Sequence, residues 1–320
     1  MTSTHQGVHA GGLGKQFGDL WALKDVDLDV PPGTVLGLLG HNGAGKTTAI
    51  RILTTLSRPT EGSATVAGLD VQAQAAEVRA NIGLAGQYAS VDGLLTARRN
   101  LELAGSLYHL PKAVIRARAD ELLERVGLAD KGDDLVKTFS GGMRRRLDLA
   151  ASLIAQPPVL FLDEPTTGLD PQSRNDLWAL LRELVAEGAT LVLTTQYLEE
   201  ADRLADDIVV LDHGRIAAHG SPAQLKAQVG GQRVEVSAPE ASGLEAAAGA
   251  LGHFASGEVS VDDGRLIVPV REDTRLMDVV RALDNAGVEA IDVQRRDATL
   301  DDVFLTLTST PGDDRMEVAA

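Results

Sequence analysis

The sequence predicts an α/β fold with a mainly parallel sheet, and two features of its hydrophobic pattern support this prediction. Short apolar runs, each suited to a strand buried on both faces, occupy residues 35–39, 159–162, 190–194 and 208–211. Helical patterns, with apolar residues three or four positions apart, lie between these runs at 46–56 and 174–187. Alternation of such strands with helices is typical of parallel sheets that helices cover on both faces.

The rest of the first domain contains a half-exposed strand and a helical block. Residues 22–30 alternate apolar and charged side chains with the period of a strand, and a Pro-Pro-Gly turn follows at 31–33. Further helical patterns lie at 94–110, 112–126 and 142–155. We therefore expect one domain at 8–228, with a helical subdomain at about 92–156.

A second, smaller domain is expected after a linker at Gly230 and Gly231. The pattern predicts strand 233–237, helix 241–251, hairpin strands 258–262 and 265–270, helix 274–286 and strand 290–295. This β-α-β-β-α-β order is that of a ferredoxin-like α+β domain. With a last helix at 300–307, we expect the domain to span 231–308 and to leave a flexible tail at 309–320.

The composition excludes several classes of function. With 46 acidic and 30 basic residues the formal net charge is −16, so no nucleic-acid partner is expected. The sequence has no cysteine, which excludes disulfides and thiolate metal sites. No apolar run approaches the roughly 18 residues that a transmembrane helix needs.

The segment GHNGAGKTT at 40–48 matches the phosphate-binding pattern G-x-x-x-x-G-K-[ST] and lies between a predicted buried strand and a predicted helix. Its glycines let backbone N–H groups point at phosphates, beside the partial positive charge of the helix N-terminus. Lys46 would reach the β- and γ-phosphates, and Thr47 would bind Mg²⁺. The alternative is a glycine turn with a chance lysine. The predicted nucleotide contacts in this loop are Gly40, Asn42, Gly43, Ala44, Gly45, Lys46, Thr47 and Thr48.

Two adjacent carboxylates, Asp163 and Glu164, follow the buried strand at 159–162. Ligands of open α/β sheets bind outside the carboxyl ends of the strands. Asp163 is the expected partner of Mg²⁺, and Glu164 is expected to polarise the water that attacks the γ-phosphate. An Asp-Glu pair in a solvated loop is the alternative.

A further helix N-terminus begins with Ser140, Gly141 and Gly142. Ser140 suits an ordinary N-cap. Glycine, however, is a poor choice in a first turn unless a backbone must come close to something. In the same helix, Arg145 and Arg146 are expected on a solvated face.

Together these motifs resemble the nucleotide-binding subunit of an ABC transporter, over roughly residues 10–225. They follow the order of that family: the Walker A loop at 40–48, the Q-loop at 82–87, the signature FSGGM at 139–143, Walker B at 159–164 and the D-loop at 168–170. Segments 86–92, 142–151, 194–202 and 300–305 resemble the daunorubicin/doxorubicin-resistance type. The resemblance implies a P-loop NTPase of the ABC ATPase class.

The resemblance also implies roles for matching residues, with ATP and Mg²⁺ as cofactors. Phe17 would stack on adenine, unless it is a core residue at the edge of a sheet. Gln87 would sense Mg²⁺ and the attacking water. Residues 140–142 would bind the γ-phosphate of ATP held by the opposite subunit of a homodimer, and Asp170 would line the dimer seam.

Two positions depart from the family pattern. Met143 stands in the signature where glutamine is more usual. Gln196 stands at the switch position, where most of the family carries histidine, so we expect Gln196 to position and stabilise charge rather than to titrate. None of the seven histidines has metal-ligand spacing, and His41 is interpreted as a spectator.

The resulting prediction is an ATPase subunit that powers export of a hydrophobic drug or antibiotic through a separately encoded membrane permease. The chain would then lie at the cytoplasmic face of the cell membrane, held there by the permease. The alternative is a soluble ABC ATPase of translation or DNA repair, which the acidic balance and the single phosphate loop disfavour. A third interpretation makes the second domain a small-ligand sensor.

Overall fold

The computed structural model describes residues 7–86, 90–228, 232–262, 264–271 and 273–309. Its contacts divide the chain into two compact units, Met1–His219 and Gly220–Ala320. Gln87, the linker expected at Gly230 and Gly231, and the tail after residue 309 lie outside the described residues. The domain limits expected from the sequence, 8–228 and 231–308, therefore stay predictions.

The first unit is built on a six-stranded sheet with the order β10-β9-β3-β8-β7-β6. Strand β3 pairs in parallel with β8 and β9, and β7 pairs in parallel with β6 and β8. Every residue of β3, β7 and β8 is buried. The prediction of a mainly parallel α/β sheet is thus confirmed. Its strands are β3 (Val35–Leu39), β6 (Ile82–Ala85), β7 (Val159–Asp163), β8 (Thr190–Thr195), β9 (Asp207–Asp212) and β10 (Arg215–Gly220).

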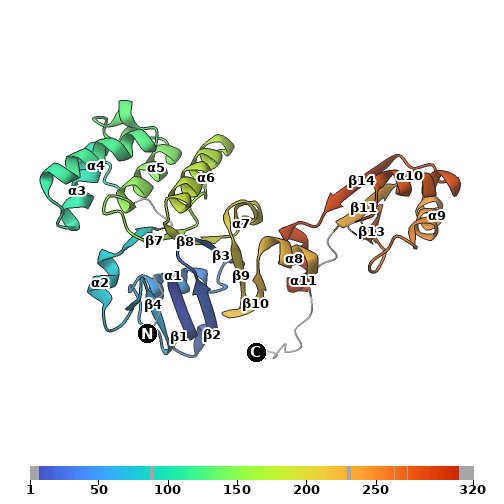
Figure 1. The fold of residues 1–320 in the computed structure, drawn as a ribbon, viewed down its shortest axis with the longest axis horizontal. Helices are drawn as coiled ribbons and strands as arrows, with labels where there is room; N and C mark the ends of the chain where they lie inside the picture. Colours follow the sequence, from blue (N-terminus) through green and yellow to red (C-terminus); the bar gives the residue numbers. More distant parts are fainter. Residues whose placement is uncertain (1–6, 87–89, 229–231, 263, 272, 310–320) are drawn as a thin grey trace, which may run out of the picture. The chain divides into compact units, whose positions relative to one another are not determined.

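Two hydrophobic clusters bury the two faces of this sheet. On one face, Leu36, Leu38 and Phe161 share a cluster with Ile50 of helix α1 (Lys46–Leu53) and with an antiparallel sheet of order β2-β1-β4-β5. On the other face, Leu160 shares a cluster with apolar residues of the helical subdomain, such as Leu122 and Leu147. Figure 1 shows the helices of this subdomain. Side chains alternate across each strand, so a fully buried strand needs apolar residues at both parities. The second sheet has β1 (Val8–Phe17), β2 (Leu20–Val30), β4 (Glu61–Val66) and β5 (Leu69–Asp70).

The helical subdomain has three longer helices, as predicted, with shorter limits. Helix α3 begins later than expected because Thr96 caps it, accepting a hydrogen bond from the backbone N–H of Arg99 at 3.2 Å. It ends before His109, whose φ of 57° is left-handed. None of the described helices is long and apolar enough to cross a bilayer. The helices of the first unit are α1, α2 (Ala75–Ala80), α3 (Ala97–Leu107), α4 (Lys112–Arg125), α5 (Gly141–Ser152), α6 (Pro171–Ala186) and α7 (Leu198–Leu204).

The second unit has the strand order β12-β13-β11-β14, with all pairs antiparallel. The two central strands are therefore the first and the third of the β-α-β-β-α-β order, which is the ferredoxin-like arrangement predicted from the sequence. Helix α8 (Pro222–Gln228) contacts the last helix, α11 (Leu300–Ser309). The remaining elements are β11 (Gln232–Ser237), α9 (Ala241–Leu251), β12 (Ser260–Asp262), β13 (Arg265–Val270), α10 (Leu276–Asn285) and β14 (Asp292–Asp297).

The core of the second unit can be tested at Leu266, which is 1% exposed on β13. Leu266→Ala should lower the free energy of unfolding of this unit by about 2–5 kcal/mol, because it leaves a cavity. Calorimetry of the whole chain should show the loss, and ATP binding should not change. Val261→Ala is the control, because Val261 is 60% exposed on neighbouring strand β12. Equal losses from both substitutions would contradict the packing described here.

Candidate nucleotide-binding site

The loop between β3 and α1 depends on its glycines. Gly40, Gly43 and Gly45 have φ values of 152°, 87° and 110°, which L side chains rarely adopt. A Cβ atom on Gly40 would lie 2.4 Å from the carbonyl oxygen of Leu211, and one on Gly45 would lie 2.6 Å from that of Ala22. The loop can therefore follow this path only with glycine at these two positions.

Donors gather where this loop enters helix α1. The N-cap residue is Gly45, which has no side chain to accept hydrogen bonds from the N–H groups of the first turn. Lys46 is 4% exposed, and its Nζ donates to the carbonyl oxygens of Gly40 at 2.7 Å and His41 at 3.1 Å. Burial lowers the pKa of Lys46, and the carboxylates of Glu164 and Asp163 oppose this shift. A helix N-terminus beside a buried ammonium fits a phosphate chain.

The carboxylate of Asp163 lies beside the same helix. Strand pairing places Asp163 opposite Thr194, whose hydroxyl donates to its Oδ1 at 2.5 Å. The hydroxyl of Thr47 donates to the same oxygen at 3.3 Å. A hydroxyl and a carboxylate oxygen next to a phosphate site form a donor set that suits Mg²⁺. The structure thus brings together the two described residues predicted to hold the metal.

Glu164 follows on a strained stretch of backbone. Its φ of 49° is left-handed, which is uncommon for a residue other than glycine. Its N–H donates to the backbone oxygen and the hydroxyl oxygen of Thr194, at 3.1 and 3.0 Å. The hydroxyl of Thr167 donates to its carboxylate at 3.3 Å. Glu164 is half-buried and held by these contacts, which does not fit a freely solvated loop.

Two other predicted residues lie on the surface. Phe17 ends strand β1 and is 56% exposed, so it is not the core residue that was the alternative to adenine stacking. The ammonium of Lys15 lies 5.1 Å from the centre of its ring. Gln196 directly follows β8 and is exposed, close in sequence to Thr194 and on the same sheet edge as Asp163.

The N-terminus of helix α5 has a serine cap followed by two glycines, and the structure explains these three residues differently. Ser140 is its N-cap and accepts a hydrogen bond from the N–H of Met143 at 3.2 Å, as the simpler interpretation expects. A Cβ atom on Gly142 would lie 2.8 Å from the hydroxyl of Ser173, so packing within the chain explains that glycine. A Cβ atom on Gly141 would meet nothing within 4 Å. Packing against the described residues therefore does not account for Gly141.

Asp170, predicted at the dimer seam, caps helix α6. It accepts hydrogen bonds from the backbone N–H of Ser173 at 2.9 Å and from the Ser173 hydroxyl at 2.7 Å. These two bonds, the backbone one first, lower the pKa of Asp170. Ser173 thus donates to Asp170 and leaves no room for a Cβ atom on Gly142, so the start of α6 lies close to the start of α5.

The expectation that Arg145 and Arg146 form a solvated face is wrong. Arg145 is 7% exposed and donates to the carbonyl oxygens of Pro165, Asp163 and Gly86. Arg146 is partly buried and donates to the carbonyl oxygen of Val126 at 3.0 Å. The sequence signal for a buried charge was Asp148, which lies three positions after Arg145 and between Leu147 and Leu149.

Among the described residues, one group of possible metal-ligand side chains lies beside the phosphate loop. His41, Asp212 and His213 offer ligand atoms that lie within 4.8 Å of one another, although no spacing in the sequence suggested it. The Nε2 atom of His41 lies 3.0 Å from the carboxylate of Asp212, and its Nδ1 lies 2.7 Å from the carbonyl oxygen of Asn42. The contact between His41 and Asp212 joins the phosphate loop to the β9–β10 turn, which accounts for this grouping without a metal.

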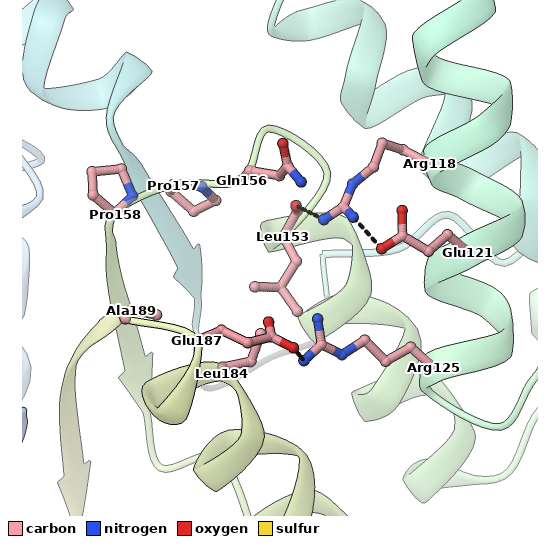
Figure 2. A pocket seen from close by; sticks show the side chains of 11 residues that line it. Arg118, Glu121, Arg125, Leu153, Gln156, Pro157, Pro158, Leu184, Glu187 and Ala189 are labelled. Carbon is pink, nitrogen blue, oxygen red and sulfur yellow. Dashed lines mark hydrogen bonds and ion pairs between the residues drawn. The ribbon is translucent and has the colours of Figure 1, made fainter. Parts of the chain in front are cut away.

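A cavity of about 370 Å³ lies apart from these residues (Figure 2). It is bordered by helix α4, the segment before β7 and the loop after α6. Arg118 pairs there with Glu121 at 2.5 Å, and Arg125 pairs with Glu187 at 2.6 Å. None of the predicted nucleotide contacts lines it. We therefore place the candidate site at the phosphate loop and not in this cavity.

Comparisons with known proteins identify the family of the chain. The family model for ABC transporters matches residues 23–167, and that for the DrrA1-3-like C-terminal domain of ATP-binding proteins matches residues 220–308. The chain is 54% identical to the daunorubicin resistance ATP-binding protein DrrA2 of Streptomyces coeruleorubidus, over 94% of both chains. It is 40% identical to the Nod factor export ATP-binding protein I of Cupriavidus pinatubonensis, over 92% of this chain and 88% of the relative.

Solved ATP-binding cassettes align with about two thirds of the chain. An ATP-binding subunit of an ABC transporter aligns with a TM-score of 0.64 and 29% identity, over 70% of this chain and 93% of the other. A bacterial ABC transporter cassette solved as a dimer aligns with a TM-score of 0.62 and 27% identity, over 67% of this chain and 98% of the other. The chain belongs to the ATP-binding subunits of ABC transporters, and within them to the group of the daunorubicin and doxorubicin resistance ATPases.

Proposed function

We propose that two copies of this chain hydrolyse ATP at their interface to power export of a hydrophobic drug or antibiotic through a separately encoded membrane permease. The permease would hold the chain at the cytoplasmic face of the cell membrane. The observation that carries the proposal is the meeting of Lys46, Thr47, Asp163 and Glu164 at one sheet edge. The cargo class is supported by relatives named for daunorubicin resistance, which share 54% and 55% identity with the chain.

The residues at the sheet edge divide the work of phosphoryl transfer. The α1 N-terminus and Lys46 bind the phosphates and stabilise the charge that develops on them. Thr47, Asp163 and, by resemblance, Gln87 would hold Mg²⁺, which would supply positive charge at the phosphate oxygens. Thr194 orients the Asp163 carboxylate for this task through its 2.5 Å hydrogen bond.

Glu164 serves as the general base. Its carboxylate accepts a proton from the attacking water while the Thr167 hydroxyl steadies one of its oxygens. Gln196, at the end of the neighbouring strand, donates a hydrogen bond from its amide to a γ-phosphate oxygen. Because an amide does not titrate near neutral pH, Gln196 contributes charge stabilisation and no proton transfer.

The homodimer is inferred from the start of helix α5. Ser140 and Gly141 are exposed there, and the space beside Gly141 is open. In the dimer, the phosphate end of ATP held by the other copy approaches this helix N-terminus, which is suited to anions. Gly141 is then required by a contact between chains, in contrast to Gly142, which Ser173 explains within one chain.

The first test replaces the general base. Glu164→Gln should keep ATP binding and slow hydrolysis by roughly 10²–10⁴-fold, because an amide cannot accept the proton. Lys46→Ala, the control for binding, should bind ATP poorly. In cells that also produce the permease, the parent chain should lower accumulation of a fluorescent anthracycline, and both variants should not. Parent-like export by Glu164→Gln would contradict the proposed function.

The second test concerns Gly141. Gly141→Ala should leave stability unchanged or raise it by up to about 1 kcal/mol, since alanine favours helix, and should lower ATP turnover because its methyl group meets the opposite nucleotide. Gly249→Ala is the matched control: Gly249 lies in helix α9, and a Cβ atom there also meets nothing within 4 Å. Thermal midpoints and steady-state rates measure both effects. Equal turnover in the two variants would remove Gly141 from the interface.

The third test concerns Gln196. Gln196→Ala should lower kcat by roughly 10–10³-fold, the range for loss of one transition-state donor. Gln196→His should retain much of the activity and gain a pH dependence between about 5.5 and 7.5, where imidazole titrates. Rates measured across this pH range separate the two variants. If Gln196→Ala hydrolyses ATP at the parent rate, the side chain does not act in the reaction.

A further inference from the structure

The guanidinium of Arg145 contacts the backbone next to Glu164. Its Nε donates to the carbonyl oxygen of Pro165 at 2.8 Å, and its Nη2 donates to that of Asp163 at 3.1 Å. These two carbonyl groups flank Glu164. A single planar guanidinium thus holds the backbone on both sides of Glu164, in the fork geometry that only arginine offers.

Glu164 needs such support because its backbone is left-handed, with φ of 49°. Thr194 holds the N–H of Glu164 from one side, through its carbonyl and hydroxyl oxygens. Arg145 holds the neighbouring carbonyl groups from the other side. A residue other than glycine stays in this conformation only where its surroundings fix it.

The charge partner of Arg145 shows what the guanidinium is used for. Asp148 is 3% exposed, and its carboxylate lies 3.6 Å from Nη1 of Arg145, beyond hydrogen-bond distance. Nη1 instead donates to the carbonyl oxygen of Gly86. Asp148 accepts a hydrogen bond from the N–H of Ser90 at 2.7 Å. Arg145 therefore directs its donors at backbone oxygens, while Asp148 balances its charge from a greater distance.

Arg145 also connects two parts of the proposed machinery. It lies on helix α5, whose N-cap is Ser140, and it contacts the segment that carries Glu164. The helix α5 backbone and the Arg145 side chain together link Ser140 to the segment around Glu164. We propose that Arg145 is a positioning residue for Glu164. Through Arg145, the orientation of the Glu164 carboxylate depends on helix α5, which begins with the signature motif. This inference rests on the proposed function, in which Glu164 is the base.

The experiment must separate misplacement of Glu164 from loss of fold. Removing Arg145 alone would leave Asp148 buried without its counter-charge, and such a variant can simply fail to fold. The variant to measure is therefore the neutral pair Arg145→Met with Asp148→Asn. Its reference is Asp148→Asn alone, in which the amide oxygen can still accept the Ser90 N–H and Arg145 is intact.

We expect the double variant to show kcat on the order of 100-fold below that of Asp148→Asn, as for a misplaced catalytic group. The KM and the equilibrium Kd for ATP should stay within about threefold of the reference, because the phosphate loop is not altered. Arg146→Met is the control for loss of an arginine in the same helix. Its partner is the carbonyl oxygen of Val126, so it should lower the thermal midpoint and leave kcat near the parent value.

Combination with Glu164→Gln gives a readout that a purely structural role would not produce. Adding the double substitution to Glu164→Gln should slow hydrolysis little further, because both act on the same base. If the double variant hydrolyses ATP as fast as Asp148→Asn while Glu164→Gln is inactive, Arg145 is not a positioning residue and the proposed function stands. If Glu164→Gln itself turns over at the parent rate, the role of Glu164 falls, and this inference falls with it.

Discussion

Strands β3, β7 and β8 are buried along their whole length, so their polar neighbours can lie only where the strands end. The pairing aligns Leu39 with Thr195 and Asp163 with Thr194, which brings the ends of the three strands to one level. The phosphate loop, the Walker B carboxylates and Gln196 all leave the sheet at this level. Because burial on both faces fixes the strand positions, the separations between these groups are set by the core rather than by the loops themselves.

The loops at this edge adopt conformations that are costly in isolation. Gly40 and Gly45 avoid the cost because glycine lacks the Cβ atom that would meet a backbone oxygen. Glu164 cannot avoid it, since a carboxylate is needed there, and a left-handed residue of this kind costs about 1–3 kcal/mol. The Glu164 N–H donates to Thr194, and Arg145 donates to the carbonyl oxygen of Pro165, and these hydrogen bonds hold the segment in place. The strain at Glu164 is thus offset by the hydrogen bonds that surround it.

The first two turns of helix α5 differ, because the first includes exposed residues and the second includes a buried charged pair. Its first turn carries Ser140 and the open position at Gly141, where the proposed partner nucleotide approaches. Its second turn carries Arg145 and Asp148, which are buried together against the Walker B segment. A charged pair in this position is expensive to bury unless its hydrogen bonds are satisfied. The three backbone oxygens that accept from Arg145 satisfy the guanidinium, and the N–H of Ser90 donates to one oxygen of Asp148. The other carboxylate oxygen of Asp148 has no hydrogen-bond partner among the described residues and lies 3.6 Å from Nη1 of Arg145.

The sheet class, the ferredoxin-like order of the second unit and the position of the phosphate loop could be predicted from the sequence, because apolar periodicity and glycine spacing are local signals. The sequence could not determine the burial of Arg145, which depends on a carbonyl group 59 residues away, or the pairing of His41 with Asp212 across 171 residues. It also could not separate Gly141 from Gly142, since only the packing of α6 shows that one glycine has a reason within the chain. Long-range contacts decide these points, because burial of a charge is a property of everything that surrounds it.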